Sequence, residues 1–175
     1  RKTHNNIMRS GIGVGGYCLT KDPLFAKASS KQILNEKFDF PLCSKAVEVN
    51  QKMTFDVMSE IKDKFTKKLL GKKVLLIGVS YREDTNDTRY SPAEGVFDFF
   101  KKMRCKLNFY DPIVNYWEYL DNYSIEKKDI KNFDVYVYLI KHQSFKKLNI
   151  PYKKKSIILD LNHVLEKKQK LKIVK

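Results

Sequence analysis

The strongest constraint on the fold is an uninterrupted apolar run at positions 74–79, Val-Leu-Leu-Ile-Gly-Val. Such a run, bounded by polar residues, is typical of a parallel strand that is buried on both faces of a sheet. Shorter apolar runs follow, and segments that we interpret as helical separate them. This order predicts a β-α-β-α-β-α-β unit with right-handed crossovers, which is an α/β fold with a parallel sheet. The expected strands are 74–79, 107–110, 135–140 and 157–159, and the expected helices are 92–103, a segment near Trp117, and 144–148.

A long amphipathic helix is expected before the first strand, over residues 42–70. Its apolar side chains recur at three- and four-residue steps and form one stripe. Gly71 follows in the position that commonly ends a helix. A helix of this length commonly packs against a second copy of the chain or against another domain. The stripe comprises Ala46, Val47, Asn50, Met53, Val57, Met58, Ile61, Phe65 and Leu69.

A glycine-rich segment near the start of the chain leads directly into a cysteine. Four glycines within residues 11–16 allow close approach to a ligand and backbone conformations that other residues avoid. Cys18, Lys21 and Asp22 follow, and we expect Asp22 to cap a short helix over 23–30 that has Pro23 in its first turn. A cysteine just ahead of a helix and near a lysine lies in positive potential, which favours the thiolate.

This segment also has two less specific interpretations. Gly11, Gly13 and Gly16 satisfy the G-x-G-x-x-G dinucleotide fingerprint, but that motif needs an apolar strand before it, whereas residues 1–10 are polar. Cys18 taken alone could equally be a small buried hydrophobic residue, the usual state of a free cysteine. The Cys-Lys-Asp continuation favours a ligand cradle beside a nucleophile.

Residues 80–91 form the loop at the carboxyl end of the first strand, where parallel sheets bind ligands. Arg82 and Arg89 supply positive charge there, and we expect Asp87 to orient Arg89 through paired hydrogen bonds. For the loop alone, ordinary solvation of both arginines is an equally good interpretation.

Three segments in order resemble the UDP-glucose/GDP-mannose dehydrogenase family. Residues 11–22, Gly-Ile-Gly-Val-Gly-Gly-Tyr-Cys-Leu-Thr-Lys-Asp, are similar to the segment around that family's catalytic cysteine. Residues 73–92 are similar to the strand and loop that open its C-terminal nucleotide-sugar domain, and Tyr110-Asp111-Pro112 resembles the end of that domain's second strand. The resemblance runs from about residue 7 to residue 162 and implies a Rossmann-like C-terminal domain.

The resemblance implies an NAD-dependent UDP-sugar 6-dehydrogenase, which oxidises the sugar C6 alcohol to a uronic acid and reduces two NAD+. Cys18 would carry a thiohemiacetal and then a thioester, and Asp22 would help to organise the hydrolytic water. Lys21 and Arg89 match residues that face the NAD cofactor. The substrate residues that the resemblance implies are Arg9, Ser10, Gly11, Gly15, Tyr81 and Arg82, with Arg82 in place of the usual lysine.

The resemblance also divides the chain. It assigns residues 1–71 to the end of a central helical dimerisation domain that contains the cysteine loop, and residues 72–175 to the UDP-sugar-binding domain. The N-terminal NAD-binding domain is missing, so we expect a C-terminal part of a cytoplasmic, homodimeric enzyme that is inactive by itself. At Asp160-Leu161-Asn162, the arginine of the family's Asp-x-Arg segment is also missing.

Composition leaves two other classes of function open. A stand-alone nucleotide-sugar-binding or scaffold module without catalysis would keep the same motifs. A formal charge of +15 would suit a basic nucleic-acid-binding domain, but no recognition motif accompanies it, and we favour a lysine-rich surface. We expect no membrane segment, disulfide or metal site, and we assign the three histidines no role.

Overall fold

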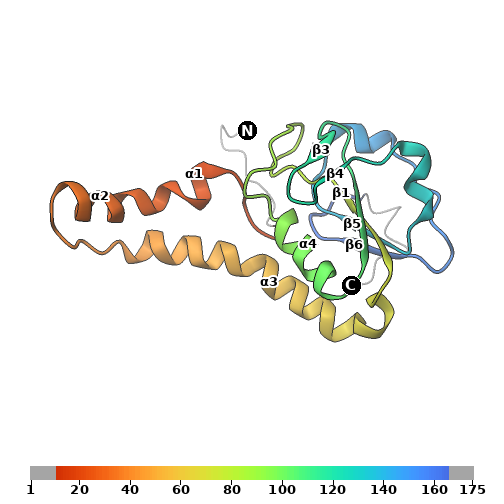
Figure 1. Ribbon diagram of the computed structural model, residues 1–175, viewed down its shortest axis with the longest axis horizontal. Coiled ribbons are helices and arrows are strands. Elements are labelled where there is room, and N and C mark those ends of the chain that lie inside the picture. Colours follow the sequence, from red (N-terminus) through yellow and green to blue (C-terminus); the bar gives the residue numbers. More distant parts are fainter. Residues whose placement is uncertain (1–10, 166–175) are drawn as a thin grey trace, which may run out of the picture.

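The computed structural model describes residues 11–165. Figure 1 shows an α/β body on the right, from which a helical arm projects to the left. The elements are α1 (Tyr17–Thr20), η1 (Asp22–Leu24), α2 (Phe25–Ile33), α3 (Pro41–Leu69), β1 (Lys73–Ile77), α4 (Ala93–Lys102), β2 (Lys106–Tyr110), β3 (Tyr116–Trp117), β4 (Asn122–Tyr123), η2 (Lys127–Asn132), β5 (Val135–Tyr138), η3 (Gln143–Lys147) and β6 (Ile157–Asp160), where η marks a 3-10 helix.

The main sheet has four parallel strands in the order β2-β1-β5-β6. In β1, Val74 and Leu76 contribute to one hydrophobic core, whereas Leu75 and Ile77 contribute to a second core on the opposite face. All four side chains are fully buried. The expected parallel sheet, with its first strand buried on both faces, is therefore confirmed.

The crossovers between strands are less helical than the sequence predicts. The link from β1 to β2 is the expected α-helix, α4, whose Val96, Phe97 and Phe100 are buried. The link from β2 to β5 contains a small antiparallel hairpin, β3-β4, and the 3-10 helix η2. The link from β5 to β6 contains only the 3-10 helix η3. The expected helix at 92–103 is therefore confirmed as α4, and the helical segment expected at 144–148 is present as the 3-10 helix η3 rather than as an α-helix.

The prediction of a helix near Trp117 is wrong. Trp117 lies in strand β3, and its ring is buried against Phe97 and Phe109 at centroid distances of 6.0 and 5.8 Å. Asp121 has a φ of 54°, which a continuing right-handed helix does not allow and which turns the chain into β4. Packing of one large ring thus outweighs the local helical pattern.

Helix α3 confirms the predicted long helix within one residue at each end. Gly71 follows it with a φ of 69°, the left-handed conformation typical of the residue after a helix. Met58 and Leu69 are buried in the core that also contains Leu76 of β1, so the C-terminal half of α3 packs on the α/β body. Of the predicted stripe, Ala46 alone is exposed.

The N-terminal half of α3 runs beside α2 and α1 and forms the helical arm (Figure 1). Here, large apolar side chains face solvent, with Leu42 83% exposed and Ile33 78% exposed. None of the helices in the described part of the chain has both the length and the apolar character that a membrane crossing requires.

Candidate functional site

The cysteine loop turns into a helix directly after its glycines. Gly16 has a φ of 79°, and the Thr20 hydroxyl donates a hydrogen bond to the Gly16 carbonyl oxygen at 2.6 Å. The resulting turn, α1, contains Cys18. Cys18 does precede the expected helix, which is present as η1 and α2, but it lies inside α1, a short helical turn that the sequence does not predict. The positive φ of Gly16 lets the chain turn before the cysteine as well as after it.

The predicted cap of the next helix also differs. Asp22 is the first residue of η1 and makes no capping bond, since Lys21 occupies the cap position. Pro23 does lie in the first turn, as expected, and α2 then extends over Phe25–Ile33 rather than 23–30. Because the carboxylate of Asp22 is not engaged in a cap, it remains available for another role.

Three side chains, two from α3 and one from the segment after β6, hold the backbone of the glycine segment. Asn50 of α3 binds Val14 twice, accepting from its N–H and donating to its carbonyl oxygen, both at 2.8 Å. The buried Thr54 hydroxyl donates to the Ile12 carbonyl oxygen at 2.7 Å. Asn162, after β6, accepts from the Ile12 N–H at 3.1 Å and also donates to the Leu139 carbonyl oxygen.

This arrangement accounts for the amide at position 162. An arginine is expected there from the family resemblance, but the asparagine ties the glycine segment to the carboxyl edge of the sheet.

The glycine segment also contacts the loop at residues 80–91. The Gly16 N–H donates to the Arg89 carbonyl oxygen at 3.0 Å. A Cβ atom on Gly15 would lie 2.5 Å from the Tyr81 Cβ and 2.6 Å from the Tyr90 carbonyl oxygen. Only glycine fits at position 15, so the two predicted loops meet in direct backbone contact.

Arg89 is held by Asp87, as the sequence predicts. The guanidinium donates to both carboxylate oxygens, from Nε at 2.8 Å and from Nη2 at 2.6 Å. The bond from Arg89 lowers the pKa of Asp87, and the same pair raises the pKa of Arg89. The Arg89 side chain is nevertheless 60% exposed, so its outer edge remains free to meet an anion.

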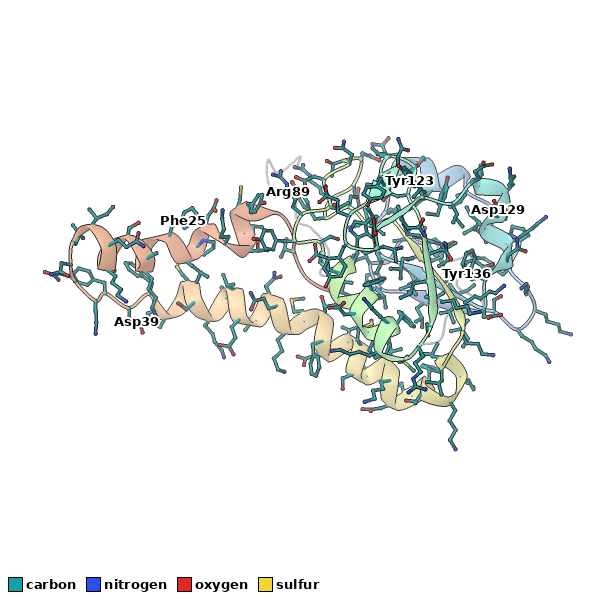
Figure 2. The ribbon with its side chains drawn as sticks, viewed as in Figure 1. Phe25, Asp39, Arg89, Tyr123, Asp129 and Tyr136 are labelled. Carbon is teal, nitrogen blue, oxygen red and sulfur yellow. The ribbon has the colours of Figure 1, made fainter. Side chains whose placement is uncertain are left out.

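Tyr17 joins the two cations that are predicted to face the cofactor. The Lys21 Nζ lies 4.6 Å from the centre of the Tyr17 ring, and the Arg89 Cζ lies 4.7 Å from it. The Tyr90 ring packs edge-on against Tyr17 at 5.0 Å. Figure 2 places Arg89 at the junction between the helical arm and the α/β body. The sequence patterns predict no role for Tyr17, although this residue directly precedes Cys18.

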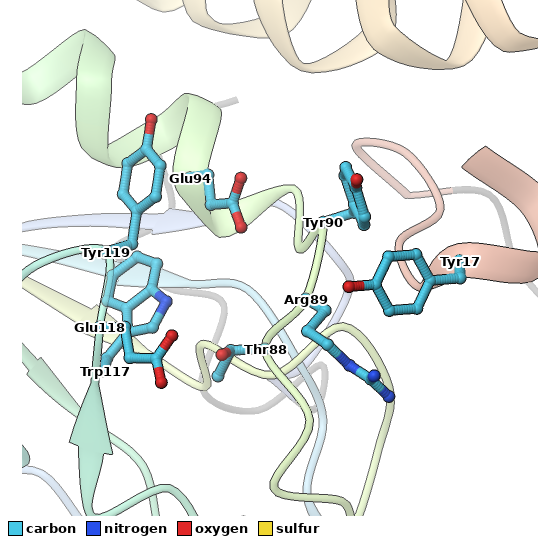
Figure 3. Close-up of a pocket in the computed structure, with 8 residues that line it drawn as sticks. All are labelled: Tyr17, Thr88, Arg89, Tyr90, Glu94, Trp117, Glu118 and Tyr119. Carbon is cyan, nitrogen blue, oxygen red and sulfur yellow. The ribbon is translucent and has the colours of Figure 1, made fainter. Parts of the chain in front are cut away.

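An open pocket of about 380 Å³ lies beside this aromatic contact (Figure 3). Arg89 and Tyr17 line one side, and Glu94, Glu118 and Tyr119 line the other. Burial, with the nearby Asp98 charge, raises the pKa of Glu94. Burial and a 2.9 Å hydrogen bond to Asp98 raise the pKa of Tyr119 to about 12. The pocket thus presents positive charge on one wall and carboxylates on the other.

The other predicted site residues that the structure describes have exposed or half-buried side chains and are less closely associated with Arg89 and Tyr17. Cys18, Asp22 and Arg82 are exposed, and Tyr81 is half-buried against the glycines. Within residues 11–165, no hydrogen bond or ion pair joins the side chains of Cys18, Asp22 or Arg82 to the other predicted site residues. Arg9 and Ser10 lie outside the described residues.

His142, to which the sequence assigned no role, lies at the carboxyl edge of the sheet with 0% of its surface exposed. Its Nε2 lies 3.2 Å from the Asp111 Oδ2 and 3.4 Å from the Ser80 Oγ. Its Nδ1 accepts a hydrogen bond from the Asp84 N–H at 3.0 Å. Because Nδ1 is an acceptor, the proton of the neutral ring is on Nε2, which donates to Asp111.

Asp111 is the anionic centre of this edge. Burial by itself raises the pKa of its carboxyl group, but hydrogen bonds from His142 and from the Ile113 and Val114 N–H groups outweigh burial and lower it. The Val79 N–H donates a further bond at 2.8 Å. Asp111 therefore remains ionised and joins the ends of β1, β2 and β5. The Tyr-Asp-Pro motif was noticed in the sequence, but its partner His142 follows 31 residues later.

A parallel sheet with basic loops at its carboxyl edge is the architecture of a nucleotide-binding α/β domain. Residues 75–167 match the UDP-binding domain of the UDP-glucose/GDP-mannose dehydrogenase family. The chain belongs to this family.

Individual relatives agree with that assignment. The chain is 32% identical over 164 residues to a UDP-N-acetyl-D-mannosamine dehydrogenase of Methanococcus aeolicus, covering 93% of this chain and 34% of the relative. It is 25% identical to a UDP-glucose 6-dehydrogenase of Rickettsia conorii, covering 96% and 41%. An NDP-N-acetyl-D-galactosaminuronic acid dehydrogenase of Methanosarcina mazei has a TM-score of 0.74 at 26% identity, covering 91% of this chain and 36% of that one. The chain therefore spans about a third of the length of these relatives.

Proposed function

We propose that the chain is the C-terminal part of an NAD-dependent UDP-sugar 6-dehydrogenase that oxidises the sugar C6 alcohol to a uronic acid. The observation that carries the proposal is the junction of its two motif loops. The cysteine loop at residues 11–22 and the loop at residues 80–91 meet through the bond from the Gly16 N–H to the Arg89 carbonyl oxygen. A thiol and a basic nucleotide loop are thereby brought to one edge of the sheet.

Cys18 is the proposed nucleophile. Its sulfur adds to C6 at the aldehyde stage to give a thiohemiacetal, and after the second oxidation C6 is held as a thioester. Water then attacks the thioester carbonyl, which releases the carboxylate and the thiol. Exposure of Cys18 at the surface of the described chain is consistent with access for a substrate. Asp22 follows Cys18 by four residues and makes no capping bond, and its proposed role is to orient that water.

Lys21 and Arg89 are the proposed contacts to NAD. Both present positive charge around one aromatic ring, and Arg89 keeps an exposed edge, which fits an anionic dinucleotide. When bound, each NAD+ would accept one hydride, so two NAD+ molecules in succession would supply the acceptors for the two oxidation steps. The chain's own contribution is to hold these two cations in a fixed relation to Cys18 through Tyr17.

The UDP-sugar is proposed to lie along residues 80–91 and the glycine segment. Tyr81 and Arg82 follow β1 directly, and ligands of parallel sheets bind at this edge. Gly11 and Gly15 leave backbone groups accessible at close range, and Arg82 offers a fork of donors to a phosphate.

We further propose that residues 1–71 belong to a central dimerisation domain and residues 72–175 to the UDP-sugar domain. The exposed apolar side chains of the arm support a homodimer, because surfaces of this kind mark protein interfaces. Light scattering of the full-length protein would test the dimer. A monomer at micromolar concentration would contradict it.

The function is tested by NADH formation in the full natural chain. UDP-glucose and UDP-N-acetylmannosamine are offered with NAD+, and we expect two NADH per sugar oxidised with one of them. UDP binding without any NADH would instead identify a non-catalytic nucleotide-sugar module. Failure to bind UDP at all would contradict both, and retention of DNA or RNA that UDP does not displace would then favour a nucleic-acid-binding domain.

A further inference from the structure

Two hydrogen bonds, which together we call the latch, join Asp84 to His142 and to the next residue, Gln143; each runs from a backbone N–H to a side-chain acceptor. The Asp84 N–H donates to the His142 Nδ1 at 3.0 Å, and the Gln143 N–H donates back to the Asp84 Oδ1 at 3.0 Å. The two residues are 58 positions apart, and the latch joins the loop after β1 to the segment after β5. It therefore fixes the middle of residues 80–91 against the sheet.

The latch holds a conformation that the loop would otherwise avoid. Asp84 has a φ of 55°, a left-handed conformation that costs a residue other than glycine free energy and persists only where the surroundings impose it. Within the described chain, the Asp84 N–H has no hydrogen-bond partner other than His142. Loss of the imidazole acceptor would therefore leave the Asp84 N–H without its hydrogen bond and remove one of the two bonds that hold this conformation.

The imidazole is itself held rigidly. Its Nε2–H faces Asp111, and its ring packs edge-on against Phe145 at 5.2 Å. Asp111 also accepts bonds from three backbone N–H groups, of Val79, Ile113 and Val114, so its position does not depend on His142. The imidazole ring therefore links the loop at residues 80–91 to the carboxyl edge of the sheet, where Asp111 and Phe145 hold the ring in place.

We propose that His142 is a positioning residue that sets nucleotide affinity by fixing residues 80–91, which carry Tyr81, Arg82 and Arg89. The identity of the ligand rests on the function proposed above, whereas the latch itself does not. Without the latch, the loop must be ordered when the nucleotide binds, and that cost reduces the affinity.

Two substitutions separate positioning from a general structural role. His142→Asn places an amide oxygen near the position of Nδ1 and can still accept from the Asp84 N–H. His142→Gln places an amide nitrogen near Nε2, so it retains the bond to Asp111 but loses the one to Asp84. Both remove the buried ring, so damage from packing affects both variants alike.

The test measures UDP binding to the full-length protein by calorimetry, and amide hydrogen exchange across residues 80–91 without ligand. We expect His142→Gln to weaken UDP binding about tenfold and to speed exchange in the loop, and His142→Asn to stay within about twofold of the unsubstituted protein. Equal behaviour of the two variants in both measurements would overturn the inference.

Asp84 provides a second route if substitution of the buried ring prevents folding. Asp84→Ala removes the acceptor for the Gln143 N–H and should reproduce the effect of His142→Gln, whereas Asp84→Asn keeps an acceptor and should not. Identical exchange in both Asp84 variants would contradict the latch. If the unsubstituted protein binds no UDP, the proposed function fails, and hydrogen exchange alone still decides whether the latch exists.

Discussion

The N–H of Gly16 donates a hydrogen bond to the carbonyl oxygen of Arg89 at 3.0 Å. These residues are 73 positions apart in a chain of 175 residues. Gly16 ends the glycine segment that leads to Cys18, and Arg89 is the residue whose guanidinium pairs with Asp87. The bond fixes the backbone that leads to Cys18 against the backbone of the loop that carries Arg89.

Substitution of Gly15 should separate these loops. In Gly15→Ala the new Cβ would lie 2.5 Å from the Tyr81 Cβ and 2.6 Å from the Tyr90 carbonyl oxygen. We expect a loss of about 2 kcal/mol in the free energy of unfolding, measured by urea denaturation, because the backbone must move.

Gly71→Ala is the matched control for Gly15→Ala. It has open space around the added methyl group and a φ of 69°, and should lose about 1 kcal/mol from conformation alone. A smaller loss in Gly15→Ala than in Gly71→Ala would contradict the close contact of the loops.

Asp111 should make stability depend on pH in acid. Its pKa in the folded chain is lowered from the ordinary value of 3.8, so ionised Asp111 contributes stability above that value. The contribution is lost as the pH falls through the lower folded pKa. Asp111→Asn should lose about 2 kcal/mol near neutral pH, because its amide nitrogen cannot accept the bonds from His142 and Val79.

The difference in unfolding free energy between the unsubstituted protein and Asp111→Asn should therefore be constant from about pH 5 to pH 7 and shrink below about pH 4. Thermal unfolding across this range measures it. A difference that grows as the pH falls would show that Asp111 is not held as a carboxylate.

Tyr17 should influence cofactor affinity without touching the sugar. Tyr17→Ala removes the ring that lies between Lys21 and Arg89, and should raise the KM for NAD+ about three- to tenfold. Tyr17→Phe keeps the ring and should change the KM little.

Tyr123→Ala removes another exposed ring, one in the β3-β4 hairpin, and serves as the control. Steady-state kinetics of the full-length protein would measure all three variants. An unchanged KM in Tyr17→Ala would remove this ring from the account.

The sequence predicts the fold where one short-range pattern decides the outcome. The apolar run at 74–79 and the stripe of α3 identify the sheet and the long helix, because their burial leaves few alternatives. Trp117 misleads because its partners Phe97 and Phe109 come from elements far away in the chain. The early turn into α1 depends on the positive φ of Gly16, which the sequence permits without requiring it.

The candidate site divides in the same way. The pairing of Asp87 with Arg89 was predicted because only one residue separates them in the sequence, so the interaction is local. The pairing of His142 with Asp84 was not predicted, since no spacing in the sequence brings the ends of β1 and β5 together. Buried polar contacts between distant loops become visible only once the order of the strands is known.

The most direct test of the central claim, that Cys18 becomes acylated during oxidation, is the turnover of Cys18→Ser in the full-length protein. We expect kcat to fall by roughly three orders of magnitude or more while the dissociation constant for the UDP-sugar changes little. Cys43→Ser, a half-buried thiol on α3, should retain full activity. Unchanged turnover in Cys18→Ser would contradict the account.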